Sequence, residues 1–323
     1  MNIKRASLVL LSLVFMTSVS GCFSPAVYRT DIKLIETDKS IALTGDNGVI
    51  WQFNYGKETS KPFFHPVSLV DGTVLTVDRP ADHPWHHALW FSWKFINGVN
   101  FWEENRKTGK SNGITDWSNV KVVTKKYHSA TITMDLVYHH KDQKPILSEK
   151  RTMVVSPPDK DSVYYIDWTS EFTACSDTDV KIDRTPLVGE PGGKAWGGYA
   201  GLSVRLNGKG DNWAIETEKE SIYIQKGTFR GKAKGMDFSG VFGGQAAGIA
   251  ILDHPKNLNA PSPWYAVAGK PMKYFSPAVI CYKPHTLTAG KTFTLNYRVI
   301  VHPQKWDAEN LKSQIKKYTA VSR

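Results

Sequence analysis

Long runs in which apolar and polar residues alternate are the feature that most restricts the fold of this chain. Apolar side chains occupy nearly every second position in the segments 130–138, 164–172 and 293–301. This is the period of a strand with one buried face. Turn sequences separate the strand-like segments, for example Asp46-Asn47-Gly48, Pro157-Pro158-Asp159 and Asn207-Gly208. Many strands with short polar turns predict an all-β fold, here a large antiparallel sandwich or barrel.

One helix is expected, near the C-terminus. Asp307 can cap a segment in which Leu311, Ile315 and Tyr318 fall on one face, with two lysines in the last turns. A terminal helix of this kind usually packs on the outside of a sheet. The chain shows no linker and no internal repeat, so we expect a single domain over residues 31–323.

The first 22 residues have the pattern of an export signal. Lys4 and Arg5 precede an apolar run from Leu8 to Met16, and small residues stand before Cys22. The apolar run is too short to cross roughly 30 Å of hydrocarbon. A lipoprotein signal peptidase cuts before such a cysteine, whose thiol then carries diacylglycerol. The sequence therefore predicts lipidation at Cys22; an ordinary secreted protein is the alternative.

The residue after this cysteine, Phe23, is not acidic, which favours an outer-membrane lipoprotein whose domain lies in the periplasm or on the cell surface. Residues 23–30 would then be a tether. An oxidising compartment permits a disulfide between Cys175 and Cys281, and two buried thiols are the alternative.

The formal net charge is +11, but the basic residues are scattered without a long run. Export argues against nucleic acid as a partner. A solvated basic surface is therefore the favoured interpretation, with a preference for acidic glycans as the sharper alternative.

The densest chemistry lies between residues 78 and 104. Three of the ten histidines, His83, His86 and His87, stand there beside several tryptophans. Imidazole suits proton transfer near neutral pH, and aromatic faces beside polar groups suit a sugar. Adjacent residues of a strand point to opposite faces, so at most one of His86 and His87 can join His83 in a cavity.

Two other interpretations of this block stay open. The tripeptide Asp82-His83-Pro84 is also typical of a turn in which the aspartate bonds back to the backbone. The spacing of His83 and His86 can also offer imidazoles to a divalent metal, provided that a further ligand comes from elsewhere in the chain.

A second Asp-His-Pro tripeptide occurs at 253–255, followed by Asn257, Trp264 and Tyr265. Strand ends that lead into polar, aromatic loops commonly form a cleft in β-sandwiches. This block is therefore a candidate second wall of the site, with His254 facing His83. A repeated turn without functional connection is the alternative.

An acid–base enzyme needs one ionised and one protonated group across its substrate. Among the isolated carboxylates, Glu149 starts a strand, Glu171 lies on an alternating strand, and Glu190 lies in the glycine-rich stretch 189–201. Neither a Lys-Ser/Thr pair nor a helix pattern follows that stretch, so we interpret it as a loop over a site rather than a phosphate cradle. Glu190 and Glu149 are the preferred partners of the histidines.

Several blocks of the chain together resemble the PmoA-like family of bacterial exported proteins. They are 61–66, 82–102, 197–202, 253–265 and 287–302. The family pattern in the second block is similar to Asp-His-Pro-His-His-Arg-Gly-Leu-Trp, and this chain departs from it at Trp85, His87 and Ala88. The resemblance implies a β supersandwich similar to galactose mutarotases and related carbohydrate-active proteins. The methane-oxygenase label attached to the family would require spanning helices, and the sequence after Met16 has no run of that length.

These observations predict an exported carbohydrate-active enzyme, either a lyase, a glycosidase or an epimerase. His83 with His86 or His87 would move protons, and Glu190 would take the complementary role. The residues expected to contact the substrate are Arg79, Trp85, Trp90, Asn257, Trp264 and Tyr265. No cofactor is expected, although a divalent metal is not excluded. A non-catalytic glycan-binding lipoprotein and a metal-dependent enzyme are the rival predictions.

Overall fold

The structure is a computed structural model that describes residues 31–224 and 227–321. The predicted export signal, the lipidated Cys22 and the tether lie outside these residues. From Asp31 onward, the described residues form one compact unit.

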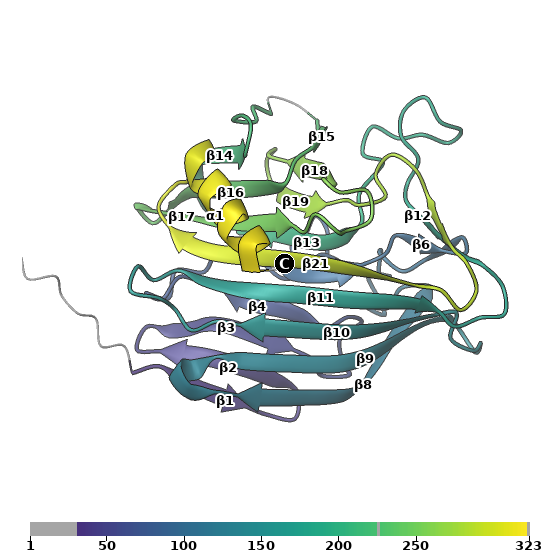
Figure 1. Ribbon diagram of the computed structural model, residues 1–323, viewed down its shortest axis with the longest axis horizontal. Helices are drawn as coiled ribbons and strands as arrows, with labels where there is room; N and C mark the ends of the chain where they lie inside the picture. Colours follow the sequence, from purple (N-terminus) through teal and green to yellow (C-terminus); the bar gives the residue numbers. More distant parts are fainter. Residues whose placement is uncertain (1–30, 225–226, 322–323) are drawn as a thin grey trace, which may run out of the picture. The chain divides into compact units, whose positions relative to one another are not determined.

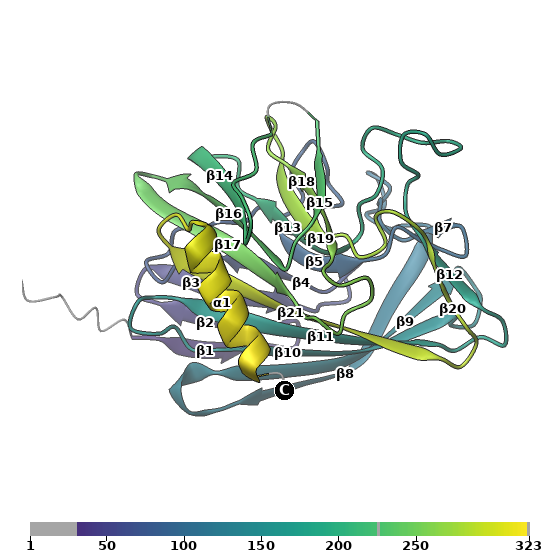
Figure 2. The same cartoon turned by 45° about the horizontal axis from the view of Figure 1, so that its top comes forward.

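Two large antiparallel sheets face each other in this unit, as Figures 1 and 2 show for the described residues. The first has nine strands, which in spatial order are β1 (Lys33–Glu36), β2 (Ser40–Gly45), β3 (Gly48–Asn54), β4 (Phe63–Val67), β5 (Leu89–Ser92), β13 (Gly201–Leu206), β19 (Lys273–Pro277), β18 (Pro263–Val267) and β15 (Phe229–Lys232). The second has eight, in the order β14 (Asp211–Thr217), β16 (Gly235–Phe242), β17 (Gln245–Asp253), β21 (Thr292–Pro303), β11 (Tyr164–Ala174), β10 (Leu147–Val155), β9 (Ala130–His140) and β8 (Gly113–Thr124).

A smaller sheet lies beside one end of the two large ones (Figure 1). Its four strands within the described residues are β20 (His285–Leu287), β12 (Val180–Asp183), β6 (Phe95–Ile96) and β7 (Val99–Asn100). A short 3-10 turn, Lys126–His128, joins β8 to β9.

The main core lies between the two large sheets. Every second residue is buried over nearly all of β9 and throughout β11, as the alternation in the sequence predicts. Aromatic pairs connect the layers: the ring centroids of Phe91 and Phe172 are 5.3 Å apart, and those of Phe64 and Trp168 are 6.1 Å apart. The predicted all-β sandwich of antiparallel strands is confirmed.

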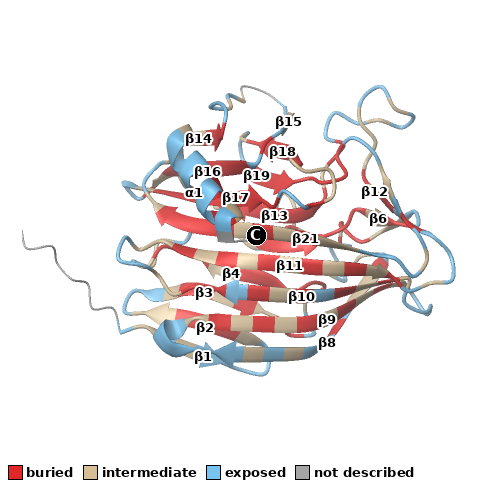
Figure 3. Ribbon diagram, in the orientation of Figure 1, coloured by how far each residue is buried: buried red, intermediate tan, exposed pale blue. Residues whose placement is uncertain are grey.

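The predicted C-terminal helix is also confirmed, as α1 (Ala308–Val321). Asp307 caps it, because its Oδ1 accepts a hydrogen bond from the backbone N–H of Asn310 at 2.8 Å. Leu311, Ile315 and Tyr318 are buried against the outer face of the eight-stranded sheet, while the opposite face of the helix is exposed (Figure 3).

Part of the outer face of the nine-stranded sheet, over β4, β5, β18 and β19, is buried as well. Along β18, Trp264 belongs to the core between the sheets, whereas the next residue, Tyr265, belongs to a second apolar cluster on the outer face. In β19, Phe275 and Tyr274 are divided between the two faces in the same way. Strands buried on both faces are nearly continuous apolar runs, so alternation cannot show which face a residue occupies.

Cys175 and Cys281 are not joined; the first thiol is exposed and the second is buried. The alternative of two buried thiols therefore holds for Cys281 but not for Cys175. Among residues 31–224 and 227–321, no helix has both the length and the apolar character that a membrane span requires.

Candidate functional site

A cavity of about 200 Å³ opens on the outer face of the nine-stranded sheet. Its lining joins imidazole and carboxylate groups, which can move protons, with aromatic rings, which can contact a ligand. The lining residues are His83, Trp85, His86, Trp102, Glu103, Trp196, Tyr199, Tyr265, Met272 and Tyr274. Four larger depressions among the described residues contain no histidine. The cavity is therefore the strongest candidate for a reactive site.

Two successive turns form the wall that carries the histidines. The backbone N–H of His83 donates to Pro80, and that of His86 donates to His83 at 2.9 Å. An isolated bridge between Asp78 and His87 closes the loop at its base. A turn is thus present at Asp82-His83-Pro84, and it brings His83 and His86 to the cavity. The Asp82 carboxylate bonds to Arg205 and His83 rather than back to the backbone as expected. Their rings stack with centroids 4.7 Å apart.

A chain of polar contacts orients His83. The Arg205 Nη2 atom donates to both oxygens of Asp82, at 2.8 and 2.7 Å, and Asp82 Oδ2 lies 2.9 Å from His83 Nδ1. Burial alone would raise the pKa of Asp82, but the hydrogen bonds from Arg205 and His83 lower it. An ionised carboxylate can only accept, so Nδ1 of His83 carries the proton. The Nε2 atom of a neutral His83 ring is therefore its basic nitrogen.

His86 lies deeper and is almost fully buried, against Trp90 and Tyr274. Burial holds its pKa well below the usual range for a histidine, and the charge of nearby Arg205 lowers it further. Its Nδ1 atom is buried without a hydrogen-bond partner among the described residues. At neutral pH, His86 therefore presents an uncharged ring to the cavity.

Glu103 supplies the carboxylate of the cavity. Lys94 donates to its Oε2, as does Asn100 at 2.7 Å, and the Tyr199 hydroxyl donates to its Oε1 at 2.9 Å. Burial would raise the pKa of Glu103, but the charge and hydrogen bond of Lys94 outweigh it, so the pKa is lowered. Glu103 is thus an ionised hydrogen-bond acceptor near neutral pH.

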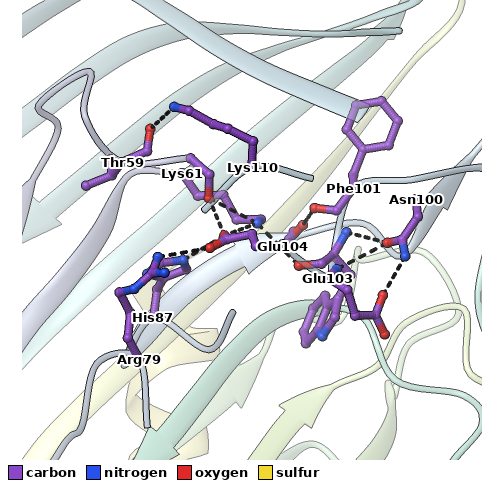
Figure 4. Close-up of polar contacts among 12 residues, drawn as sticks. Thr59, Lys61, Arg79, His87, Asn100, Phe101, Glu103, Glu104 and Lys110 are labelled. Atoms are coloured by element: carbon purple, nitrogen blue, oxygen red, sulfur yellow. Dashed lines mark hydrogen bonds and ion pairs between the residues drawn. The ribbon is translucent and has the colours of Figure 1, made fainter. Parts of the chain in front are cut away.

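The next residue, Glu104, points away from the cavity into a buried ionic network (Figure 4). It accepts hydrogen bonds from Lys61 Nζ at 2.6 Å, from His87 Nε2 at 2.8 Å and from Arg79 Nη1 at 3.1 Å. The other nitrogen of His87 lies 2.9 Å from Asp78. His87 and Arg79, predicted as catalytic and substrate-binding residues, therefore lie behind the site and hold its wall.

Three other residues predicted for the site lie away from the cavity lining. Glu190 is bound by Arg184 and by the backbone N–H of Leu187, and it is not among the residues that line the cavity. Trp264 is fully buried in the inner core, where its Nε1 donates to Ala233. Trp90 is buried beneath His86 rather than exposed to a ligand.

The Asp253-His254-Pro255 tripeptide does not line this cavity, although Tyr265, further along the same block, does. His254 packs against Tyr318 of α1, with ring centroids 5.7 Å apart, on the outer face of the other large sheet. Asn257 bonds to Asp253 and to the backbone of Asn296, so it fixes a turn. Glu149, the other preferred carboxylate, is buried with Arg151.

Sequence reasoning missed Glu103 and Trp102, although both belong to the block with the densest chemistry. The glycine-rich stretch 189–201 was expected to be a loop over a site, and it brings Trp196 and Tyr199 to the cavity. Gly198 allows the loop to approach closely, because a Cβ atom there would lie 2.6 Å from Cys281 Sγ.

In the part of the chain that the structure describes, no group of three or more His, Cys, Asp or Glu residues is arranged to hold a metal ion. His83 and His86 therefore lack a third protein ligand among these residues, which a structural or catalytic zinc site would need.

We predict that Glu104→Gln makes the fold less stable and changes its response to acid. Burial alone would raise the pKa of Glu104, but His87 and Lys61 hold it well below its ordinary value of 4.5. The ionised carboxylate therefore stabilises the fold fully above pH 4.5, and this contribution is lost as the pH falls below that value. At pH 7, Glu104→Gln should cost about 3–5 kcal/mol, because Lys61 stays buried without its partner.

Urea unfolding between pH 3 and 7 measures both effects. Lys61→Met/Glu104→Gln, which removes both charges, should recover much of the loss. Equal acid dependence in the wild type and in Glu104→Gln would contradict this assignment.

The solved structures that match this chain have low TM-scores and low sequence identity to it. The galactosidase domain of an alpha-galactosidase–sucrose kinase has a TM-score of 0.44 and 11% identity, over 84% of this chain and 42% of that one. A GH36 alpha-galactosidase from Geobacillus stearothermophilus, in complex with 1-deoxygalactonojirimycin, has a TM-score of 0.42 and 9% identity, over 84% and 41%. This chain thus spans about two fifths of the length of each. A galactose mutarotase related enzyme from Lactobacillus acidophilus has a TM-score of 0.31 and 9% identity, over 85% and 100%.

Sequence comparison assigns the chain to a family without naming an activity. No curated protein matches it significantly. A model of a family of unknown function, DUF6807, matches residues 40–316, which is most of the chain. The protein therefore belongs to the DUF6807 family.

Proposed function

We propose that the protein is a carbohydrate-active enzyme that moves protons on a sugar held in the aromatic cavity. The observation that carries the proposal is the chain of contacts from Arg205 through Asp82 to His83, which ends at a cavity walled by aromatic rings. Aromatic faces accommodate the C–H faces of a sugar, and polar tips bind its hydroxyls. The volume suits one sugar unit, being below the roughly 300–1,000 Å³ of drug-sized sites.

In this proposal, each polar group of the cavity has one task. His83 accepts a proton at Nε2 and then returns it, while Asp82 stabilises the cationic ring between the two steps. His86 stays neutral and offers a second acceptor deeper in the cavity. Glu103 stays ionised and accepts a hydrogen bond from a sugar hydroxyl. A lyase, a glycosidase and an epimerase all need such proton transfers.

The alternative is a non-catalytic glycan-binding protein. It is favoured by the large share of aromatic residues in the lining and by the extensive bonding that already engages Glu103. Both proposals predict that Tyr265→Ala weakens glycan binding. Only the enzyme releases new reducing ends, unsaturated products or an epimerised sugar.

We predict that His83→Ala reduces turnover by roughly 10²–10⁴-fold with little change in binding, because it removes the acid–base group. Asp82→Asn should also lower the rate, since it no longer fixes the Nδ1–H form of His83. A panel of neutral and acidic oligosaccharides, assayed for reducing ends, unsaturated products and epimers, provides the measurement. His128→Asn is the matched control, because His128 is exposed beside the β8–β9 connection. Full activity in His83→Ala would exclude the mechanism.

The cellular location is proposed from the sequence alone. We propose an exported lipoprotein of the outer membrane, anchored at Cys22 and exposed to the periplasm or the cell surface, with glycans as the ligands that reach it there. Membership of the PmoA-like group is proposed on the sequence blocks named above.

The lipid anchor has a direct test. Wild-type protein expressed in a Gram-negative host should incorporate an alkyne-labelled palmitate and sediment with the outer membrane. Cys22→Ser should lose the label and leave the membrane fraction. Cys175→Ser, which changes an exposed thiol of the domain, should keep both properties. An unlabelled wild type that is nevertheless exported would indicate an ordinary secreted protein.

A further inference from the structure

A second, wider groove lies next to the aromatic cavity. Its volume is about 930 Å³, and it is formed by the loop before His83, the β13–β14 connection and the β18–β19 connection. At two points, consecutive residues of the chain line the two different sites. Asp82 lines the groove and His83 the cavity, and Pro271 lines the groove and Met272 the cavity. The groove and the cavity are therefore bordered by neighbouring residues of the same two segments.

The base of the groove contains an incompletely paired guanidinium. The Arg205 side chain is only 2% exposed, and one nitrogen, Nη2, bonds to Asp82. The Nε and Nη1 atoms are buried and have no hydrogen-bond partner among the described residues. Leaving buried donors of a charged group unpaired costs free energy, so this position favours a ligand that accepts hydrogen bonds and carries negative charge.

Three lysines, Lys209, Lys270 and Lys273, add positive charge around Arg205. None of them forms an ion pair with an acidic side chain in the described part of the chain. Burial lowers the pKa of Lys273, and the nearby charges of Lys270 and Arg205 lower it further. Against these four cations the groove has only two carboxylates, Asp82 and Asp211, and the first is already bound by Arg205.

An aromatic ring completes the groove. The Trp213 indole donates from Nε1 to the backbone oxygen of Gly210 at 3.0 Å, and Lys273 Nζ lies 5.4 Å from the ring centroid. The Trp213 side chain is partly exposed. A cationic groove with an aromatic wall suits an acidic sugar, whose ring contacts the indole while its anionic group meets the cations.

We propose that this groove is an anion-binding subsite for the carboxylate or sulfate of an acidic glycan whose neighbouring sugar unit occupies the aromatic cavity. The link to the neighbouring sugar rests on the proposed function, whereas the anion site does not. The ligand class is therefore a uronate-containing or sulfated oligosaccharide. Anion binding at Arg205 also adds negative charge close to the Asp82–His83 pair.

The test uses two probes on the full chain. The first is inorganic sulfate at constant ionic strength, followed by the NMR signal of the Trp213 indole N–H, which is assigned with Trp213→Phe. The second is a matched pair of trisaccharides, trigalacturonate and its uncharged methyl ester, followed by calorimetry. Wild-type protein should bind sulfate at the groove and prefer the acidic trisaccharide. Lys209→Gln/Lys270→Gln should weaken both effects by about tenfold, because it removes two exposed charges.

The matched control is Lys121→Gln/Lys125→Gln. It removes the same charge from exposed lysines on and just after β8, at the opposite edge of the eight-stranded sheet from β14. Sulfate binding that is equal in the two double variants would overturn the anion site, and equal binding of both trisaccharides would overturn the preference for acidic glycans. Lysine-dependent sulfate binding without binding of either trisaccharide would support the anion site and count against the proposed sugar function.

Discussion

The buried carboxylate of Glu104 is the interaction on which the site depends most. It binds Lys61 just before β4, Arg79 at the base of the histidine loop and His87 at the end of that loop. The Glu104 carboxylate thus joins the segment that carries Glu103 to the loop that carries His83. Both Glu104 and Lys61 are only 1% exposed, so each would be costly to bury without its partners. The network therefore specifies one arrangement of the wall, and the geometry of the cavity follows from it.

Burial on both faces of the nine-stranded sheet explains why a cavity can exist there. Inner-face residues complete the sandwich core, and the outer-face cluster supports the loops that enclose the cavity. Arg205, on β13, adds a charged group to this arrangement. One of its nitrogens fixes Asp82 and thereby His83, while two others have no hydrogen-bond partner among the described residues. The same side chain thus connects the cavity with the cationic groove.

The strands and the helix could be predicted because their signals are local: alternation for β9, β11 and β21, and a cap with a single apolar face for α1. The site was predicted only in part, because it depends on which face of a doubly buried strand a residue occupies. Trp264 and Tyr265 are neighbours of similar chemistry, yet only the tyrosine reaches the cavity. Glu190 was named and Glu103 was not, because only tertiary packing brings Tyr199 onto Glu103, whereas Arg184 and Leu187 bind Glu190 within its own loop. The repeated Asp-His-Pro tripeptide was a turn used twice, so His254 has no place in the cavity.

The central claim is that the aromatic cavity holds a sugar against His83. A crystal structure of the protein with a bound glycan would test it most directly. The account predicts a sugar ring between the aromatic side chains of the cavity, with a substrate atom within hydrogen-bond distance of His83 Nε2. A glycan bound only elsewhere, for example in the groove beside Trp117, with an empty aromatic cavity, would contradict the account.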